Sequence, residues 1–299
     1  MEKLFIAIFS LLPALVYAYI VYITMPFKSI SLADGMRFII AGIFSVIILK
    51  YFSILGISST VPYKVLSGDM TDVTMGYKHY QYFISVGLME ELSKLLAFFI
   101  FAWLMNHINK ETMHPIAIMF YCGMVGLGFA VAENVHYANN AMQPFNVLWW
   151  RSIAPILTHM TCGFFMGYWI SLSKMSPRMY NRSLFDIIIH KREKLSRFIY
   201  TLIGLFCATI LHGVYDLHLE LNGIGGISGV YMLMILSSLG VLYCFNHIYK
   251  LNKIKENQLI NGEESSKEEN TNKSRDISES YKKGFSESQK SCEENKRNC

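Results

Sequence analysis

The sequence predicts an all-α, polytopic membrane protein of about seven transmembrane helices. Of its 299 residues, 53% are hydrophobic and only 16% are charged, whereas a soluble domain carries about 25% charged residues. The mean hydropathy is +0.31. The apolar residues gather into segments of about twenty residues or more, which is the length that a helix needs to cross a bilayer.

The first apolar segment, Leu4–Thr24, is long enough to span the membrane and stays apolar beyond a cleavage-like triplet that ends at Ala18. The preceding residues, Glu2 and Lys3, cancel in charge. Because a signal peptide has a positive flank and a shorter apolar region, we expect an uncleaved spanning helix here.

Six further segments repeat this length. All are too long for strands, and no internal repeat relates them. Their ends are defined by the polar or proline-containing stretches between them. They run Met36–Ile57, Tyr82–Met105, Pro115–Ala138, Val147–Ser173, Phe198–Leu219 and Ile224–Tyr249.

Composition divides the chain into a transmembrane domain, residues 1–250, and a polar tail, residues 251–299. The tail holds ten Lys or Arg and ten Asp or Glu. It cannot bury much apolar surface, so we expect it to be disordered. The net charge of +5 therefore belongs to the first domain. No basic patch with interleaved aromatic residues is present, so nucleic-acid binding is not expected.

Basic residues indicate the orientation in the cell membrane. The loop 174–197 carries seven Lys or Arg against two acidic residues, which predicts a cytoplasmic loop. The lysines that follow the last segment place the C-terminal tail in the cytoplasm too. Seven helices then put the N-terminus outside. The loop Ser58–Gln81 fits less well, because it carries Lys64 and Lys78 on the outer side.

Ionisable residues lie inside or at the rim of four apolar segments. A charged side chain at the bilayer centre costs roughly 2.5–3.5 kcal/mol on insertion scales, so such residues usually face a polar cavity and each other. When the helices are alternated in direction, all of these residues fall in the outer half of the membrane. That shared depth predicts a polar site. The residues are Glu90, Glu91, Lys94, Glu133, His159, His212 and Asp216.

Helical spacing places Lys94 beside two carboxylates. Glu90 is four residues and Glu91 three residues before Lys94, and both separations bring side chains together on a helix. The two adjacent carboxylates point about 100° apart, so we expect them to have different roles. A buried ion pair without catalytic function is the alternative for Glu91 and Lys94.

Two further helix faces combine a candidate residue with a polar neighbour four residues later. Glu133 shares its face with Tyr137, and His212 shares its face with Asp216. The carboxylate of Asp216 is therefore placed to orient the imidazole, although an ordinary residue at the membrane interface is the alternative.

The fifth segment is expected to pack tightly against a neighbour. Gly163 and Gly167 follow His159 on the same helix, and small residues let membrane helices approach closely. For His159 itself, a hydrogen-bonded core residue is the alternative to a catalytic role.

Four motifs occur in order along these helices. They are E-E-x-x-K at Glu90–Lys94, F-x-x-x-E-N at Phe129–Asn134, the single His159, and H-G-x-x-D at His212–Asp216. Together they resemble the PrsW family, which belongs to the wider group of CAAX-protease-like intramembrane proteases. The resemblance covers the third to sixth segments, roughly half of the chain.

The resemblance implies a peptidase embedded in the lipid bilayer. Its substrate would be a single-pass, membrane-anchored protein, cut near the extracytoplasmic face. The characterised task in that family is the first cut of an anti-sigma factor during regulated proteolysis.

The resemblance also implies the roles of the residues. Glu90 would be the general base that activates water, with Glu91 beside it. Glu133 would help to position the water or share its proton. His212 and Asp216 would stabilise the oxyanion, and His159 would complete the cluster. Three further residues would support the site: Lys94, Asn134 and Tyr137.

The catalytic type stays open between two alternatives. Glu133, His159 and His212 could hold zinc and leave one position for water. No His-Glu-x-x-His motif is present, and we favour a glutamic protease without a cofactor.

A non-catalytic scaffold or a transporter could use the same buried polar cluster. Transporters often contain inverted repeats and bind their substrate near the midplane. Here no repeat is found and the cluster lies off-centre, which favours the protease. Cleavage of a single-pass reporter that depends on Glu90 would separate these classes.

Overall fold

The structure, a computed structural model, describes residues 2–24, 30–55, 75–109, 114–174, 193–222, 228–254 and 257. Every regular element within these ranges is a helix, so the all-α prediction is confirmed. The chain divides into two units, Met1–Tyr249 and Lys250–Cys299. The predicted tail lies almost entirely outside the described residues, and its disorder stays a prediction.

The helices follow the predicted segments with shifted ends. The first two are α1 (Glu2–Thr24) and α2 (Leu32–Ile54). The full order after α2 is α4 (Met75–His79), η1 (Tyr80–Leu88), α5 (Met89–Asn109), α6 (Pro115–Asn139), α7 (Pro144–Arg151), α8 (Ala154–Ser173), α10 (Glu193–Asn222) and a last helix, Ser228–Ile254. The predicted third segment, Tyr82–Met105, consists of two consecutive helices, η1 and α5, and the short helix α4 precedes it.

Five described helices are long and apolar enough to cross a membrane, and a sixth is added if α7 and α8 form one bent span. The chain is therefore a multi-pass membrane protein. The predicted third span, Tyr82–Met105, is not among these helices. It contains Glu90, Glu91 and Lys94, which lower its apolar character. The count of seven consequently stays a prediction.

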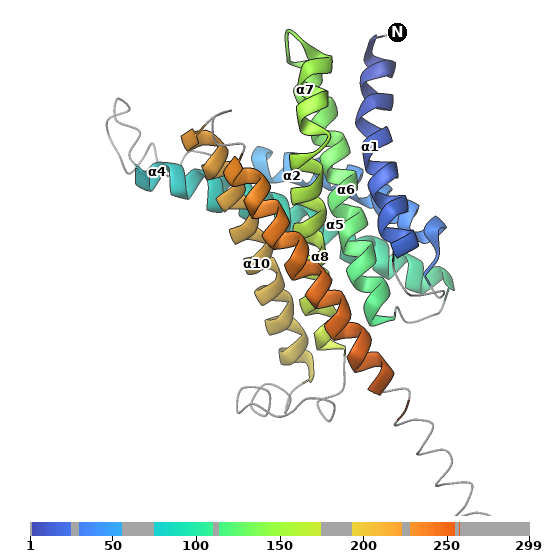
Figure 1. The fold of residues 1–299 in the computed structure, drawn as a ribbon. Helices are drawn as coiled ribbons and strands as arrows, with labels where there is room; N and C mark the ends of the chain where they lie inside the picture. The colour runs from blue at the N-terminus through green and yellow to red at the C-terminus, as the bar shows by residue number, and fades with distance from the viewer. Residues whose placement is uncertain are drawn as a thin grey trace, which may run out of the picture. The chain divides into compact units, whose positions relative to one another are not determined.

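Helix α6 is the centre of the bundle. Its sequence is apolar almost all round, which is typical of a helix that is buried on every side. It packs against α8, α2 and α1, and Figure 1 shows it between α1 and α8. Because α6 contacts so many neighbours, it fixes the positions of the helices that carry polar residues.

Glycines bring α6 and α8 into backbone contact. A methyl group at Gly126 would overlap the carbonyl group of His159, and one at Gly163 would overlap the carbonyl group of Cys122. The tight packing that the sequence predicts around Gly163 is therefore present. Its effect is to hold His159 of α8 beside the end of α6 that carries Glu133.

The predicted fifth segment is not one continuous helix, since α7 and α8 meet at an angle of 41°. Pro155 explains the break, because proline has no N–H to donate to the carbonyl group four residues earlier. That carbonyl group belongs to Arg151, and the side chain of Asn134 donates to it instead, with Nδ2 3.4 Å from the oxygen. The break thus follows from the sequence and is stabilised by α6.

Helix η1 is a π-helix of nine residues that ends directly before Met89 and Glu90. Most π-helices are single turns, and they occur frequently at functional sites. Here η1 packs against α10, and Gly213 of α10 lies against the ring of Phe83 of η1. This contact brings the start of α5 close to α10.

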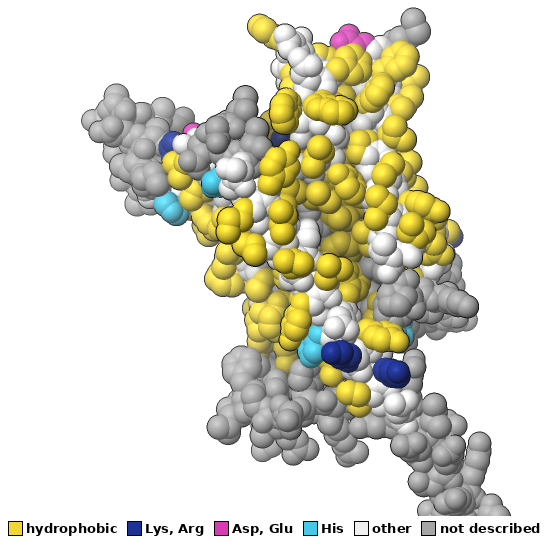
Figure 2. Space-filling model, viewed as in Figure 1, with side chains coloured by type: hydrophobic (Ala, Val, Ile, Leu, Met, Phe, Trp, Pro, Cys, Tyr) yellow, Lys and Arg dark blue, Asp and Glu magenta, His cyan; other side chains and the backbone are white. Residues whose placement is uncertain are grey.

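Large hydrophobic side chains cover the outside of the bundle. Figure 2 shows them over most of the drawn face. Examples are Leu12 of α1, Phe206 of α10 and Leu236 of the last helix, which are 54%, 64% and 56% exposed. Contiguous exposed apolar surface of this extent marks a membrane or protein contact, in agreement with a bundle that faces lipid.

Candidate active site

The predicted ionisable residues come together between α5, α6, α8 and α10. Glu91, Lys94, His159 and His212 are each no more than 3% exposed. Such groups are stable inside a bundle only when they pair with one another or with polar backbone. The contacts among them show how this is achieved.

The carboxylate of Glu91 is held by two neighbours. Its Oε1 accepts a hydrogen bond from Nζ of Lys94 at 2.6 Å and another from Nδ1 of His212 at 2.8 Å. The side chain is fully buried. Glu91 therefore links α5 to α10 and fixes the orientation of the His212 ring.

The ammonium group of Lys94 joins Glu91 to His159. Nζ lies 2.9 Å from Nδ1 of His159 and 4.0 Å from the ring centroid of Phe129. Since an ammonium group only donates, Nδ1 of His159 is the acceptor and Nε2 carries the proton. Nε2 then donates to Oε2 of Glu133 over 2.8 Å. Both ring nitrogens of His159 are thereby occupied.

Glu133 is held a second time by Arg151. Nη2 of Arg151 lies 2.6 Å from Oε2 of Glu133, and Nε donates to Oδ1 of Asn134 at 2.9 Å. The guanidinium carbon also lies 4.0 Å from the ring centroid of Tyr137. Arg151 thus connects three residues of α6 to the end of α7.

Glu90 differs from its neighbour Glu91, because it borders a cavity of about 700 Å³ that Glu133 and Tyr137 also line. Oε2 of Glu90 lies 3.9 Å from Nζ of Lys94 and 3.6 Å from Nε2 of His212. Within the described part of the chain, Oε2 of Glu90 and Oε2 of Glu91 are both buried without a hydrogen-bond partner. Nε2 of His212 is also 3.3 Å from Oδ2 of Asp216.

Residues 35–242 match the family described as PrsW family intramembrane metalloprotease. The chain belongs to the PrsW family. It is similar to Protease PrsW of Oceanobacillus iheyensis, with 25% identity over 179 residues that cover 60% of this chain and 69% of that protein. It is also similar to Protease PrsW of Shouchella clausii, with 27% identity over 183 residues that cover 59% of this chain and 72% of that protein.

No solved structure matches the chain. Membership of the PrsW family makes the chain an intramembrane protease, and so a hydrolase. The resemblance that the four motifs indicated is confirmed at the level of the family.

All six residues that the sequence predicted as catalytic in this PrsW family member lie within one connected group, together with Lys94. Asn134 and Tyr137 contact that group through Arg151. Their catalytic roles stay predictions. The sequence did not single out Arg151 or assign a role to Phe129. One feature of the sequence could have pointed to Arg151: it is the first basic residue after Gln143, and it lies four residues before Pro155.

Zinc has a different candidate set from the one that the sequence suggested. Glu90, His159 and His212 offer ligand atoms that all lie within 4.8 Å of one another. Glu133 was expected in place of Glu90, but its Oε2 already binds Arg151 and His159. Carboxylate oxygen and imidazole nitrogen are ligands that zinc prefers. The donor types of this set therefore fit the ion. Both ring nitrogens of His159 are bonded to Lys94 and Glu133 in this structure, so a zinc ion would have to replace one of these partners.

Proposed function

We propose that the chain cleaves a single-pass, membrane-anchored protein and that Glu90 accepts the proton of the attacking water. One observation carries this proposal. Of two adjacent carboxylates, Glu91 is fully buried and bonded to Lys94 and His212, whereas Glu90 lines the cavity, and its Oε2 lies 3.6 Å and 3.9 Å from the nitrogens of His212 and Lys94. A general base must reach a water molecule in this way.

The proposed reaction begins when water in the cavity loses a proton to the carboxylate of Glu90 and attacks the peptide carbonyl carbon. The carbonyl oxygen becomes an oxyanion. In its doubly protonated form, His212 donates through Nδ1 to Glu91 and through Nε2 to that oxyanion, while Asp216 stabilises the positive ring. Glu90 then gives the proton to the amide nitrogen, the C–N bond breaks, and a carboxyl and an amine product form.

The other charged residues act by position in this proposal. Lys94 keeps Glu91 ionised, and His159 connects Lys94 to Glu133. Arg151 holds Glu133 at the edge of the cavity. Preorganised partners of this kind need no rearrangement when charge develops on the substrate.

We propose that the cut lies near the extracytoplasmic face. Glu133 and His212 lie toward the C-terminal ends of α6 and α10, and His159 lies toward the N-terminal end of α8. The loop 174–197, expected in the cytoplasm from its basic residues, joins the opposite ends of α8 and α10. An anti-sigma factor is the substrate class that the family resemblance implies.

Replacement of Glu90 tests the proposal. Glu90→Gln keeps the size of the side chain but removes the proton acceptor, and general base catalysis typically supplies 10²–10⁴ in rate. Cleavage of a membrane-anchored reporter should fall by about 10²-fold or more at unchanged protein level. Glu220→Gln is the matched control, because Glu220 pairs with Lys78 outside the site. If the Glu90→Gln protein cuts at the wild-type rate, Glu90 is not the general base, and the non-catalytic scaffold becomes the preferred function.

A zinc protease is the second candidate, favoured by the donor set of Glu90, His159 and His212 and by the family description. When bound, zinc would polarise the peptide carbonyl group and lower the pKa of water. To act as a ligand, His159 must release Lys94 or Glu133 from one ring nitrogen. A strong chelator should silence a zinc enzyme, whereas it should leave the glutamic protease active.

A further inference from the structure

A second cavity, of about 580 Å³, lies beside the candidate active site. Its walls come from the end of α6, from α7, from the start of α8, from α10 and from the last helix, and they are mostly apolar. The break between α7 and α8 forms part of the wall through Ile153, Ala154 and Pro155. Leu219 of α10 and Val230 of the last helix lie on other sides.

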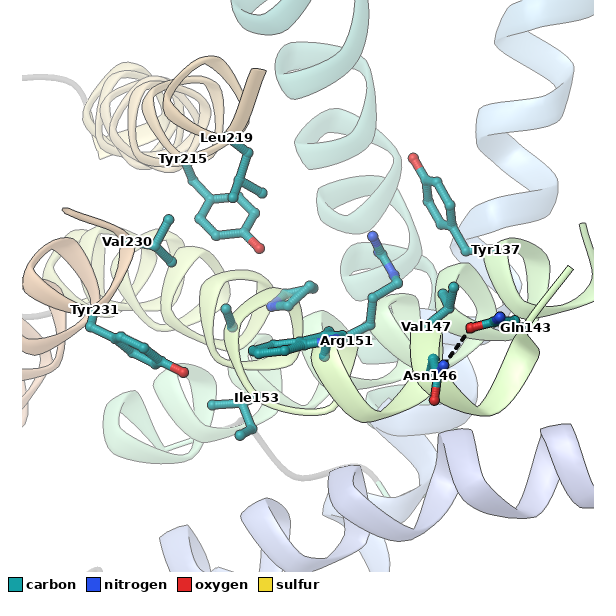
Figure 3. A pocket seen from close by; sticks show the side chains of 13 residues that line it. Tyr137, Gln143, Asn146, Val147, Arg151, Ile153, Tyr215, Leu219, Val230 and Tyr231 are labelled. Atoms are coloured by element: carbon teal, nitrogen blue, oxygen red, sulfur yellow. Dashed lines mark hydrogen bonds between the residues drawn. The ribbon is translucent and has the colours of Figure 1, made fainter. Parts of the chain in front are cut away.

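Two residues join this cavity to the one that contains Glu90. Tyr137 lines both cavities. Arg151 lines the second cavity and binds Glu133, which lines the first. In Figure 3, the Arg151 side chain lies between Tyr137 on one side and Tyr215 and Tyr231 on the other. The stacked pair of Arg151 and Tyr137 therefore forms the boundary between the two cavities.

We infer that the second cavity takes a large apolar side chain of the substrate, close to the peptide bond that is cut, and so sets the sequence preference of the protease. The inference rests on the proposed function. Glu90 and Tyr137 line the same cavity, and Tyr137 also lines the second one, so residues beside a peptide bond that is presented to Glu90 would meet the Arg151–Tyr137 boundary. The volume is in the usual range for a ligand pocket and exceeds that of any side chain.

The polar groups of the second cavity favour a peptide over a lipid acyl chain. A helix must unwind to expose a peptide bond, and its freed backbone groups then need hydrogen-bond partners inside the membrane. Gln143 and Asn146 line this cavity and are bonded to each other through one group each. An amide side chain has further donors and acceptors, which suit an unwound backbone. A lipid acyl chain has no polar group that could bond to these amides.

The experiment uses the full-length protein and a single-pass reporter whose outer membrane-boundary segment is randomised. Products are sequenced by mass spectrometry. Wild-type cleavage should enrich Phe, Leu or Met at one fixed position relative to the cut. Leu219→Trp, which fills the cavity from its wall, should reduce that enrichment by about tenfold or more and favour Ala or Gly, since hydrophobic pockets discriminate single methylene groups by roughly 10–200-fold.

Leu221→Trp is the matched control. Leu221 lies on the same helix and is 46% exposed, but it lines neither cavity. This variant should keep the wild-type preference. Cleavage without any positional enrichment, or an enrichment that Leu219→Trp leaves unchanged, would overturn the inference.

A crosslinking arm separates this inference from the proposed function. A photoreactive amino acid replaces Leu219 in a Glu90→Gln background, and the reporter library is co-expressed. Crosslinks to the reporter support the inference even if the wild-type enzyme cuts nothing, which would refute only the proposed function. Crosslinks to lipid alone, or none to the reporter, would overturn the inference whatever the cleavage result.

Discussion

Lys94 is the residue on which the whole cluster depends. Its ammonium group binds Glu91 and His159 and lies over the ring of Phe129, so one cation satisfies partners on α5, α8 and α6. Removal of one partner of a buried ion pair leaves the other charge unpaired, and this costs far more stability than removal of both partners. Substitutions at Lys94 and Glu91 should therefore depend on each other.

A double-mutant cycle tests this dependence. Lys94→Met should lower the free energy of unfolding by about 3–5 kcal/mol, because it strands the Glu91 carboxylate. Glu91→Gln should strand Lys94 in the same way. The double variant should be more stable than either single variant, as measured by thermal unfolding of purified protein in detergent.

The exposed pair of Lys78 and Glu220 supplies the control for that cycle. Its atoms are 3.4 Å apart and its side chains are 25% and 45% exposed, so the equivalent substitutions should cost no more than about 1 kcal/mol. If the losses of unfolding free energy caused by Lys94→Met and Glu91→Gln simply add in the double variant, the two residues do not act as a pair.

At the residue scale, sequence reasoning identified the members of the cluster but not its connections. Helical spacing was enough to place Lys94 beside Glu91 and His212 beside Asp216. The bond between Lys94 and His159 joins residues 65 positions apart, and no local pattern reports it. Arg151 was missed because an arginine near the start of an apolar segment looks like an ordinary membrane-interface residue.

The contact between α6 and α8 decides where His159 lies. Gly126→Ala would push a methyl group into the His159 carbonyl group, and overpacking of this kind costs about 1–3 kcal/mol. The variant should lose both stability and cleavage, as thermal unfolding and a reporter assay would show. Gly204→Ala on α10 is the milder control, because its nearest atom would lie at 3.1 Å. Equal losses in both variants would contradict a special role for Gly126.

The sequence predicted the helices whose ends are defined by the length of an apolar run. It did not predict features that are defined by the pattern of backbone hydrogen bonds. The positions of α1, α2, α6 and α10 follow from runs of hydrophobic residues. The π-helix η1 does not, since the same side chains fit an α-helix. The break at Pro155 had a local signal in the proline itself, but its stability depends on Asn134, which comes from another helix.

Orientation is the main property of the whole molecule that awaits a test. The loop 174–197 is rich in basic residues, although residues 175–192 lie outside the described ranges. We expect reporter fusions at Gln143 to be extracytoplasmic and fusions at Arg182 to be cytoplasmic, because positively charged loops stay inside. Placement of both in the cytoplasm would remove the argument that the site faces the outer side.

The central position of α6 has a consequence for the tolerance of the protein to random mutation. The long buried run from Ile116 to Val131 leaves no helix face free, whereas α1 buries only Ile6, Ser10, Ala14 and Ala18, which are spaced four residues apart. A saturation library selected for stable membrane protein should therefore be depleted at nearly every position of this α6 run, without helical periodicity. In α1 the depletion should recur every fourth residue. Substitutions should therefore accumulate at the exposed positions of α1 during evolution, and at almost no position of this α6 run.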